Sequence, residues 1–337
     1  MYHPNYVITH EQSRQSCYTK AIKDETRLSH TSESLMRSPI NDPRILEYRN
    51  RMLGGRLHAR DFAEWIQFLL REYGSMKDCL SLGSGIGRVE EYLIRIGFAR
   101  GFNTIELNPR NNVSSMKADK RICANCGDLN FVRLEPNTYD FVLCHGVLHH
   151  LINLEHVIEQ VNLALKPDGR LLIYEYVGEN RWQFSVRRLN HLRKLFPSVN
   201  LKNRPFWSIG GFEAVRSEDL LGLVRAVFGN VCDRSVEYGG VYFPMTINNW
   251  PVTKNNIVRV LALDEQISRS GELPPCYHMG IYRKSNAVIP RAMPWSDESL
   301  KAKLFPSLPL SQQARRVVLR VRGIVRLRTR LRSFAHR

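Results

Sequence analysis

The chain has 337 residues, of which 43% are hydrophobic and 24% charged, so it is long enough to bury one large core or two small ones. Its net charge of +17 is uneven, because nine arginines and no acid lie between Ser311 and Arg337, which leaves +8 on the residues before them. No apolar run approaches the roughly 20 residues that span a bilayer, and the N-terminus lacks the pattern of a secretory signal. We therefore expect a cytoplasmic protein rather than an integral membrane or secreted one.

The seven cysteines agree with a reducing compartment. Their number is odd, and several lie inside apolar runs, as buried thiols do. Cys123 and Cys126 form a CxxC pair, but no second pair follows at the spacing of a four-ligand zinc site. We therefore predict no metal site and interpret these two cysteines as strand-end residues beside a cofactor.

The first 74 residues divide into two predicted parts. Residues 1–40 are polar and lack sustained periodicity, so an irregular arm is predicted. Asp42 and Pro43 are typical of a helix start. Apolar residues then recur at helical spacing from Phe62 to Leu70, and this helix is predicted to end near Gly74.

From Cys79 onward, strands and helices alternate. Strands are predicted at 79–82, 102–107, 121–126, 141–144 and 171–177, helices at 89–96 and 154–165, and a turn at 166–169. Such alternation predicts parallel βαβ units and a doubly wound α/β sheet.

The second half of the chain continues the same domain. Helices are predicted at 183–195, 216–228 and 255–270, and late strands at 231–238 and 277–283. We therefore expect one domain over residues 41–285, a proline-rich linker over 286–310 and an arginine-rich tail over 311–337.

The strongest local motif lies where the first strand ends. Gly83, Gly85 and Gly87 stand at alternate positions between a strand and a helix, where the backbone must turn sharply and approach a ligand closely. Glu106 ends the second strand, nineteen residues beyond Gly87, where a carboxylate can accept hydrogen bonds from both ribose hydroxyls. Asp128 follows the third strand, where it can accept a hydrogen bond from an adenine amino group.

These segments, together with YDFVLCHGVLHHL and ALKPDGRLLIYEY, resemble class I S-adenosylmethionine-dependent methyltransferases from about Asp78 to Val177. The resemblance implies a Rossmann-like, mostly parallel seven-stranded sheet and S-adenosylmethionine as the cofactor. It places Gly83, Ser84, Gly85 and Gly87 beside the methionine part, Glu106 and Leu107 at the ribose, Asp128 and Leu129 at the adenine, and the backbone of Cys144 and His145 along the pocket.

A narrower similarity concerns the acceptor. The segments 175–183 and 213–219 resemble bacterial methyltransferases associated with glycan or secondary-metabolite gene clusters, although Gly178-Glu179-Asn180-Arg181 departs from their usual GPSR. We therefore expect O-methylation of a sugar or related small molecule. A general base near the methyl group is then useful, and His149, His150 and Glu175 are the candidates. The alternatives are that the histidines pack or cap a helix and that Glu175 pairs with Arg181.

Two other functions stay open. The net charge suits an RNA methyltransferase, although no RNA-binding module is recognisable, and a methyltransferase fold can also serve as a non-catalytic binding protein. The tail has apolar residues at three- or four-residue steps among its arginines. It is interpreted as a basic amphipathic helix that contacts an anionic membrane surface, as a nucleic-acid contact, or as a solvated tail.

Overall fold

The computed structural model describes residues 6–7, 9–28, 42–54, 72–197, 201, 203, 211–247, 254–289, 293–294 and 297–305. The helix predicted over 62–74 lies mostly outside the described residues, and the arginine-rich tail lies wholly outside them. None of the described helices is both long and apolar enough to cross a membrane.

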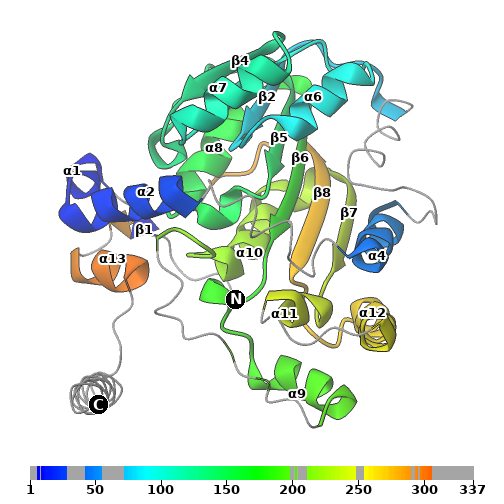
Figure 1. Ribbon diagram of the computed structural model, residues 1–337. Coiled ribbons are helices and arrows are strands. Elements are labelled where there is room, and N and C mark those ends of the chain that lie inside the picture. Colours follow the sequence, from blue (N-terminus) through cyan, green and yellow to red (C-terminus); the bar gives the residue numbers. More distant parts are fainter. Residues whose placement is uncertain are drawn as a thin grey trace, which may run out of the picture.

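A seven-stranded sheet forms the centre of the molecule, with the strand order β4-β3-β2-β5-β6-β8-β7 (Figure 1). The strands are β2 (Cys79–Leu82), β3 (Phe102–Glu106), β4 (Ile122–Cys126), β5 (Tyr139–His145), β6 (Leu165–Tyr176), β7 (Cys232–Tyr238) and β8 (Tyr277–Arg283). The first five strands of the order pair in parallel, and β8 pairs antiparallel to both β6 and β7. The predicted Rossmann-like sheet is confirmed.

Helices cover both faces of this sheet. The helices are α6 (Arg88–Arg95), α7 (Pro109–Ala118), α8 (Leu154–Ala164), α9 (Val186–Leu195), α10 (Ser217–Phe228), α11 (Tyr242–Ile247), α12 (Lys254–Ser270) and α4 (Pro43–Gly54). One hydrophobic cluster joins the sheet to α4, α6 and α12, and a second joins it to α8 and α10. Because helices lie on both faces, the central run Phe141–Cys144 is at most 1% exposed, which explains its unbroken apolar sequence.

The turn predicted at 166–169 lies inside β6. Tyr139 pairs with Leu165, whereas Phe141 pairs with Arg170, so the residues from Lys166 to Gly169 are extra length at this point of the ladder. They form an irregularity within β6, whereas the sequence predicted a turn before the strand began.

The prediction of an irregular arm over residues 1–40 is wrong for the part that the structure describes. That part holds α1 (His10–Ser13), whose N-cap Thr9 forms a capping box with Gln12, and the longer α2 (Ser16–Leu28). The predicted linker likewise contains α13 (Asp297–Leu304). Tyr18 and Ala21 of α2 pack with Leu300 and Leu304 of α13, so tertiary contacts rather than a long apolar stripe stabilise both helices.

The two ends of the described chain also meet through a short pair of strands. β1 (Tyr6–Val7) pairs in parallel with β9 (Met293–Pro294). This pairing and the contact between α2 and α13 place an N-terminal helix across the carboxyl ends of the central strands (Figure 1).

Candidate functional site

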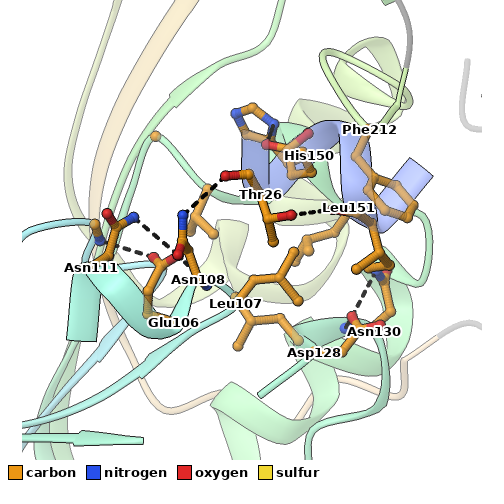
Figure 2. A pocket seen from close by; sticks show the side chains of 17 residues that line it. Thr26, Glu106, Leu107, Asn108, Asn111, Asp128, Asn130, His150, Leu151 and Phe212 are labelled. Carbon is orange, nitrogen blue, oxygen red and sulfur yellow. Dashed lines mark hydrogen bonds and ion pairs between the residues drawn. The ribbon is translucent and has the colours of Figure 1, made fainter. Parts of the chain in front are cut away.

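A cavity lies at the carboxyl ends of β2, β3, β4 and β5, which is the edge where open α/β sheets bind ligands. Figure 2 shows its lining. Loops after the four strands form most of the wall, and α2 closes the remaining side. The lining residues are Ile22, Glu25, Thr26, Gly83, Gly85, Glu106, Leu107, Asn108, Asn111, Asp128, Leu129, Asn130, Gly146, Val147, His150, Leu151 and Phe212.

The glycine loop shapes one wall of the cavity. Gly83 has φ +63°, and a Cβ on it would lie 2.2 Å from Cγ2 of Val147, so no larger residue fits there. Gly85 has φ +56°, with open space where a Cβ would project. The loop therefore brings bare backbone to the edge of the cavity.

Glu106 is held in place at the end of β3. One of its oxygens accepts hydrogen bonds from the Gly85 amide at 3.0 Å, and the other accepts them from the Asn108 amide at 2.9 Å and Asn111 Nδ2 at 3.4 Å. A carboxylate has about four lone-pair positions, so with three of them occupied this fixed group can still accept one further hydrogen bond, on the oxygen that faces Gly85.

Asp128 is held from two sides after β4. Its Oδ1 accepts from the Asn130 amide at 3.0 Å, and its Oδ2 accepts from Tyr18 Oη at 2.6 Å. Burial, together with the negative charge of Asp128, raises the pKa of Tyr18 well above its usual value, so the phenol stays protonated and donates. A residue of α2 is thus bonded to an acid of the cavity.

The structure brings six of the ten predicted cofactor residues to the cavity. Gly83, Gly85, Glu106, Leu107, Asp128 and Leu129 line it. Ser84, Gly87, Cys144 and His145 are not among the lining residues. Cys144, a residue of β5, is fully buried in the core. His145 stacks on Tyr174 with ring centroids 5.3 Å apart, and Gly87 is the N-cap of α6. The residue after His145, Gly146, lines the cavity in their place.

Sequence reasoning missed the contribution of α2 and of the asparagines. Ile22, Glu25 and Thr26 come from a segment predicted to be irregular. Asn108 accepts from the Arg110 amide as the N-cap of α7, and its Nδ2 donates to the Thr26 carbonyl at 3.1 Å. The Asn-Pro pair at 108–109 is a recognisable helix start, and it could have marked this position as structured.

Glu175 and His149 form a bonded pair beside the cavity. Glu175 is fully buried in β6 and accepts hydrogen bonds from the amides of Val147 and Leu148 at 2.7 and 2.9 Å. Its other oxygen lies 2.8 Å from His149 Nδ1. The alternative that Glu175 pairs with Arg181 is not what the structure shows, because Arg181 donates to the backbone carbonyls of Gly211 and Glu213.

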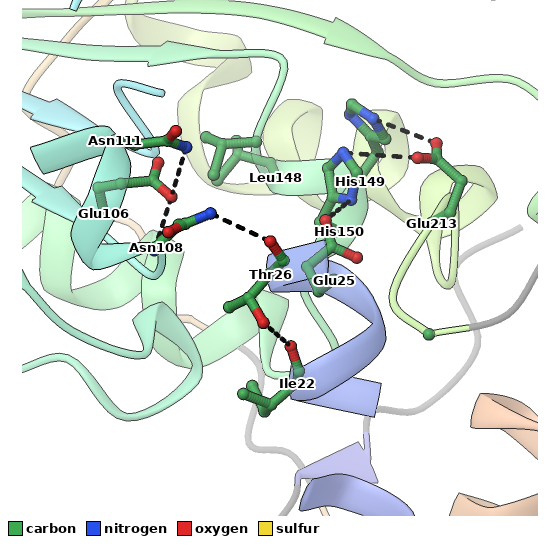
Figure 3. A network of polar contacts seen from close by, with 12 residues as sticks. Ile22, Glu25, Thr26, Glu106, Asn108, Asn111, Leu148, His149, His150 and Glu213 are labelled. Carbon is green, nitrogen blue, oxygen red and sulfur yellow. Dashed lines mark hydrogen bonds and ion pairs between the residues drawn. The ribbon is translucent and has the colours of Figure 1, made fainter. Parts of the chain in front are cut away.

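His150 reaches the cavity itself and is surrounded by acids (Figure 3). Its Nδ1 lies 3.1 Å from Glu25 Oε1 and its Nε2 lies 3.8 Å from Glu213 Oε2. Burial disfavours the charged imidazole, but Glu25 and Glu213 outweigh burial and raise the pKa of His150 to about 10. By contrast, burial lowers the pKa of His145 to about 4. At neutral pH His150 is therefore charged and His145 is neutral.

Comparison with known proteins found similarity to one protein family and to parts of two curated proteins. Residues 54–208 match the model of a family described as a methyltransferase domain. An uncharacterized protein of Methanocaldococcus jannaschii is 33% identical over 112 residues, which are 33% of this chain and 46% of that protein. The mitochondrial arginine-hydroxylase NDUFAF5 of Mus musculus is 23% identical over 142 residues, which are 42% of this chain and 39% of that protein. The match thus spans less than half the length of either relative.

Among the solved structures to which the chain is similar is the S-adenosylmethionine dependent methyltransferase from Mesorhizobium loti. It is 16% identical, with 66% of this chain and 97% of that chain covered and a TM-score of 0.41.

The residues of the cavity fit the cofactor of such a domain. The bare glycine loop, the fixed carboxylates of Glu106 and Asp128, and the open space beside Gly85 and Gly146 suit the methionine, ribose and adenine parts. Ser84 Oγ is buried without a hydrogen-bond partner in the part of the chain that the structure describes, but Ser84 is not among the lining residues. The chain is thus similar to methyltransferase domains over residues 54–208, and its cavity fits S-adenosylmethionine, the cofactor implied by that similarity.

Proposed function

We propose that the chain transfers a methyl group from S-adenosylmethionine to a hydroxyl oxygen of a sugar or related small molecule. The observation that carries the proposal is the pairing of buried Glu175 with His149 next to the cofactor cavity. A carboxylate that accepts from Nδ1 fixes the imidazole and leaves its Nε2 able to take a proton.

The reaction requires one alignment and one proton transfer. The acceptor oxygen attacks the methyl carbon as the carbon–sulfur bond breaks, and S-adenosylhomocysteine leaves. The hydroxyl proton passes to His149 Nε2, which lies 3.6 Å from Glu213 Oε1, so the imidazolium that forms is stabilised between two carboxylates. His150 lies beside it but already carries its proton at neutral pH, so it cannot accept another in this step.

The test is methyl transfer by the purified chain from labelled S-adenosylmethionine to a panel of nucleotide sugars, glycans and total RNA. We expect label in a sugar-containing acceptor. His149→Ala and Glu175→Gln should lower kcat about 10²- to 10⁴-fold while S-adenosylhomocysteine binding changes little.

His191→Ala is the matched control, because His191 also pairs with a carboxylate, Glu272 at 3.1 Å, but does not line the cavity. It should keep full turnover. Unchanged turnover in His149→Ala would remove the proposed base, and label found in RNA instead of sugars would favour the RNA methyltransferase.

A further inference from the structure

Three side chains beside the cofactor cavity converge in a way that the methyl transfer alone does not require. His149 and His150 follow β5, and Glu213 comes from the segment that precedes α10. We propose that this group, the histidine–carboxylate cluster, binds one divalent transition-metal ion. The binding of the ion stands independently of methyl transfer, whereas its role rests on the function proposed above.

The ligand atoms lie close to the spacing that a metal ion needs. His149 Nε2 is 3.6 Å from Glu213 Oε1, and His150 Nε2 is 3.8 Å from Glu213 Oε2. One ligand atom from each of the three residues lies within 4.8 Å of the others. Ligands about 2.1 Å from an ion lie about 3.0–3.4 Å apart, so the side chains would have to draw together, by up to about 1.4 Å for a pair at the 4.8 Å limit, to complete the site.

The carboxylates behind the imidazoles support the same conclusion. His149 Nδ1 lies 2.8 Å from Glu175 Oε2, and His150 Nδ1 lies 3.1 Å from Glu25 Oε1. Metal-binding histidines typically have a carboxylate on the second ring nitrogen, because it fixes the tautomer and the ring orientation. Both Nε2 atoms are thereby left facing the same carboxylate, as Figure 3 shows.

The charges of the site also favour a cation. Glu25, Glu175 and Glu213 surround two imidazoles, and the nearby cation Arg181 directs its guanidinium to backbone carbonyls. Buried carboxylates are costly unless they are paired or coordinate a metal. The cluster is also reachable, since the three ligand side chains are 12–23% exposed.

The ligand set indicates which ions would bind. Two imidazole nitrogens and one carboxylate suit Mn²⁺, Fe²⁺, Co²⁺ or Zn²⁺, whereas Mg²⁺ and Ca²⁺ prefer sites made of oxygen alone. Three protein ligands leave positions open, and His150 borders the cofactor cavity. An ion there would displace the proton that His150 carries at neutral pH. It would lower the pKa of a bound acceptor hydroxyl, whose proton would pass to solvent, because His149 Nε2 would then be a ligand and not a base.

Glu25 would connect the ion to the cofactor. It lies on α2 next to Thr26, and both residues line the cavity. Ordering Glu25 behind His150 would hold α2 in place over the cofactor, so the ion and the cofactor should bind more tightly together than alone. By linkage, each must strengthen the other by the same factor.

The test is calorimetric titration of the chelator-treated full chain with MnCl₂, ZnCl₂ and MgCl₂, with and without S-adenosylhomocysteine. We expect one Mn²⁺ or Zn²⁺ per chain and far weaker Mg²⁺ binding. Glu213→Gln should lower the Mn²⁺ affinity at least about 100-fold, and Glu175→Gln about 10- to 100-fold. Glu272→Gln, which alters the remote His191–Glu272 pair, should match the wild type.

The visible spectrum of added Co²⁺ gives a second readout, since its bands report nitrogen ligands and should be lost in His149→Ala. S-adenosylhomocysteine binding by each variant shows that it is folded, and no acceptor is needed, so this test and the methyl-transfer test fail separately. Absence of saturable Mn²⁺ or Zn²⁺ binding in the wild type, or equal affinities in Glu213→Gln and Glu272→Gln, would overturn the proposal.

Discussion

Tyr18 of α2 donates a 2.6 Å hydrogen bond to Oδ2 of Asp128, a residue 110 positions later in the chain. The same ring packs edge-on against Phe131 and Phe212. One side chain thus joins the N-terminal helix to an acid of the cofactor cavity and to the loops on both sides of it.

Tyr18→Phe removes this hydrogen bond and keeps the ring contacts. We expect the free energy of unfolding to fall by about 1.5–3 kcal/mol, because the lost bond is to a charged, partly buried acceptor. Urea denaturation measures the change. Tyr73→Phe is the control, since Tyr73 meets Asp233 at an exposed 3.5 Å contact and its loss should change stability by less than about 0.5 kcal/mol.

Gly83→Ala should abolish S-adenosylhomocysteine binding, because the new Cβ would lie 2.2 Å from Val147 and displace the loop that lines the cavity. Gly97→Ala is the matched control: Gly97 also has a positive φ, +77°, but has open space around it. Both variants should lose about 1–2 kcal/mol of stability from backbone strain. Calorimetric binding by Gly83→Ala equal to that of Gly97→Ala would contradict the role of this loop.

Glu106→Gln tests the ribose carboxylate. An amide can accept at only one end, so its NH₂ would face either the Gly85 or the Asn108 amide that now donates to the carboxylate. We expect affinity for S-adenosylhomocysteine to fall about 10- to 100-fold, which corresponds to about 1.4–2.8 kcal/mol. Asp119→Asn, which alters an exposed pair with Arg121, should leave the affinity unchanged.

Glu90 makes stability depend on pH. It is 2% exposed, and burial raises its pKa from 4.5 to about 7 although Ser81 donates to it. A carboxyl whose folded pKa is raised binds more protons when folded, so stability falls as pH rises from about 4.5 to about 7 and is flat above.

Glu90→Gln removes this titration and keeps the contact with Ser81. Unfolding in urea should show the variant more stable than the wild type by up to about 3 kcal/mol at pH 8 and nearly equal to it near pH 4.5. Glu91→Gln, one residue later, serves as the control. If the difference in free energy of unfolding between Glu90→Gln and the wild type did not change with pH, the proposed titration of buried Glu90 would be wrong.

Local patterns were sufficient for most of the sheet. The glycine loop, the apolar run 141–144 and the predicted strand over 277–283 all correspond to observed strands and their ends. For 141–144 the reason is that a parallel strand covered on both faces needs unbroken apolar sequence. The carboxyl-edge rule then placed Glu106 and Asp128 at one cavity without knowledge of any contact.

The remainder depends on contacts between distant segments, which a local pattern does not encode. Helix α2 buries few apolar residues, and its position follows from partners such as Asp128 and Leu300. Glu25 and Glu213 approach the two histidines from distant segments on either side of them in the sequence, so no spacing in the sequence could reveal the cluster. The expectation that no metal site exists considered only the CxxC spacing, and Cys123 and Cys126 are exposed free thiols.

The contact between α2 and α13 has a consequence for how the protein folds during its synthesis. Tyr18 and Ala21 pack with Leu300 and Leu304, and β1 pairs with β9. The sheet and its glycine loop can form while later residues are still being added at the ribosome. Tyr18 can meet Asp128, Phe131 and Phe212 earlier, but the helix that closes the cavity meets Leu300 and Leu304 only after they have been synthesised, and such long-range contacts form late in folding. A nascent chain that ends before residue 300 should therefore hold α2 less firmly over the cofactor site.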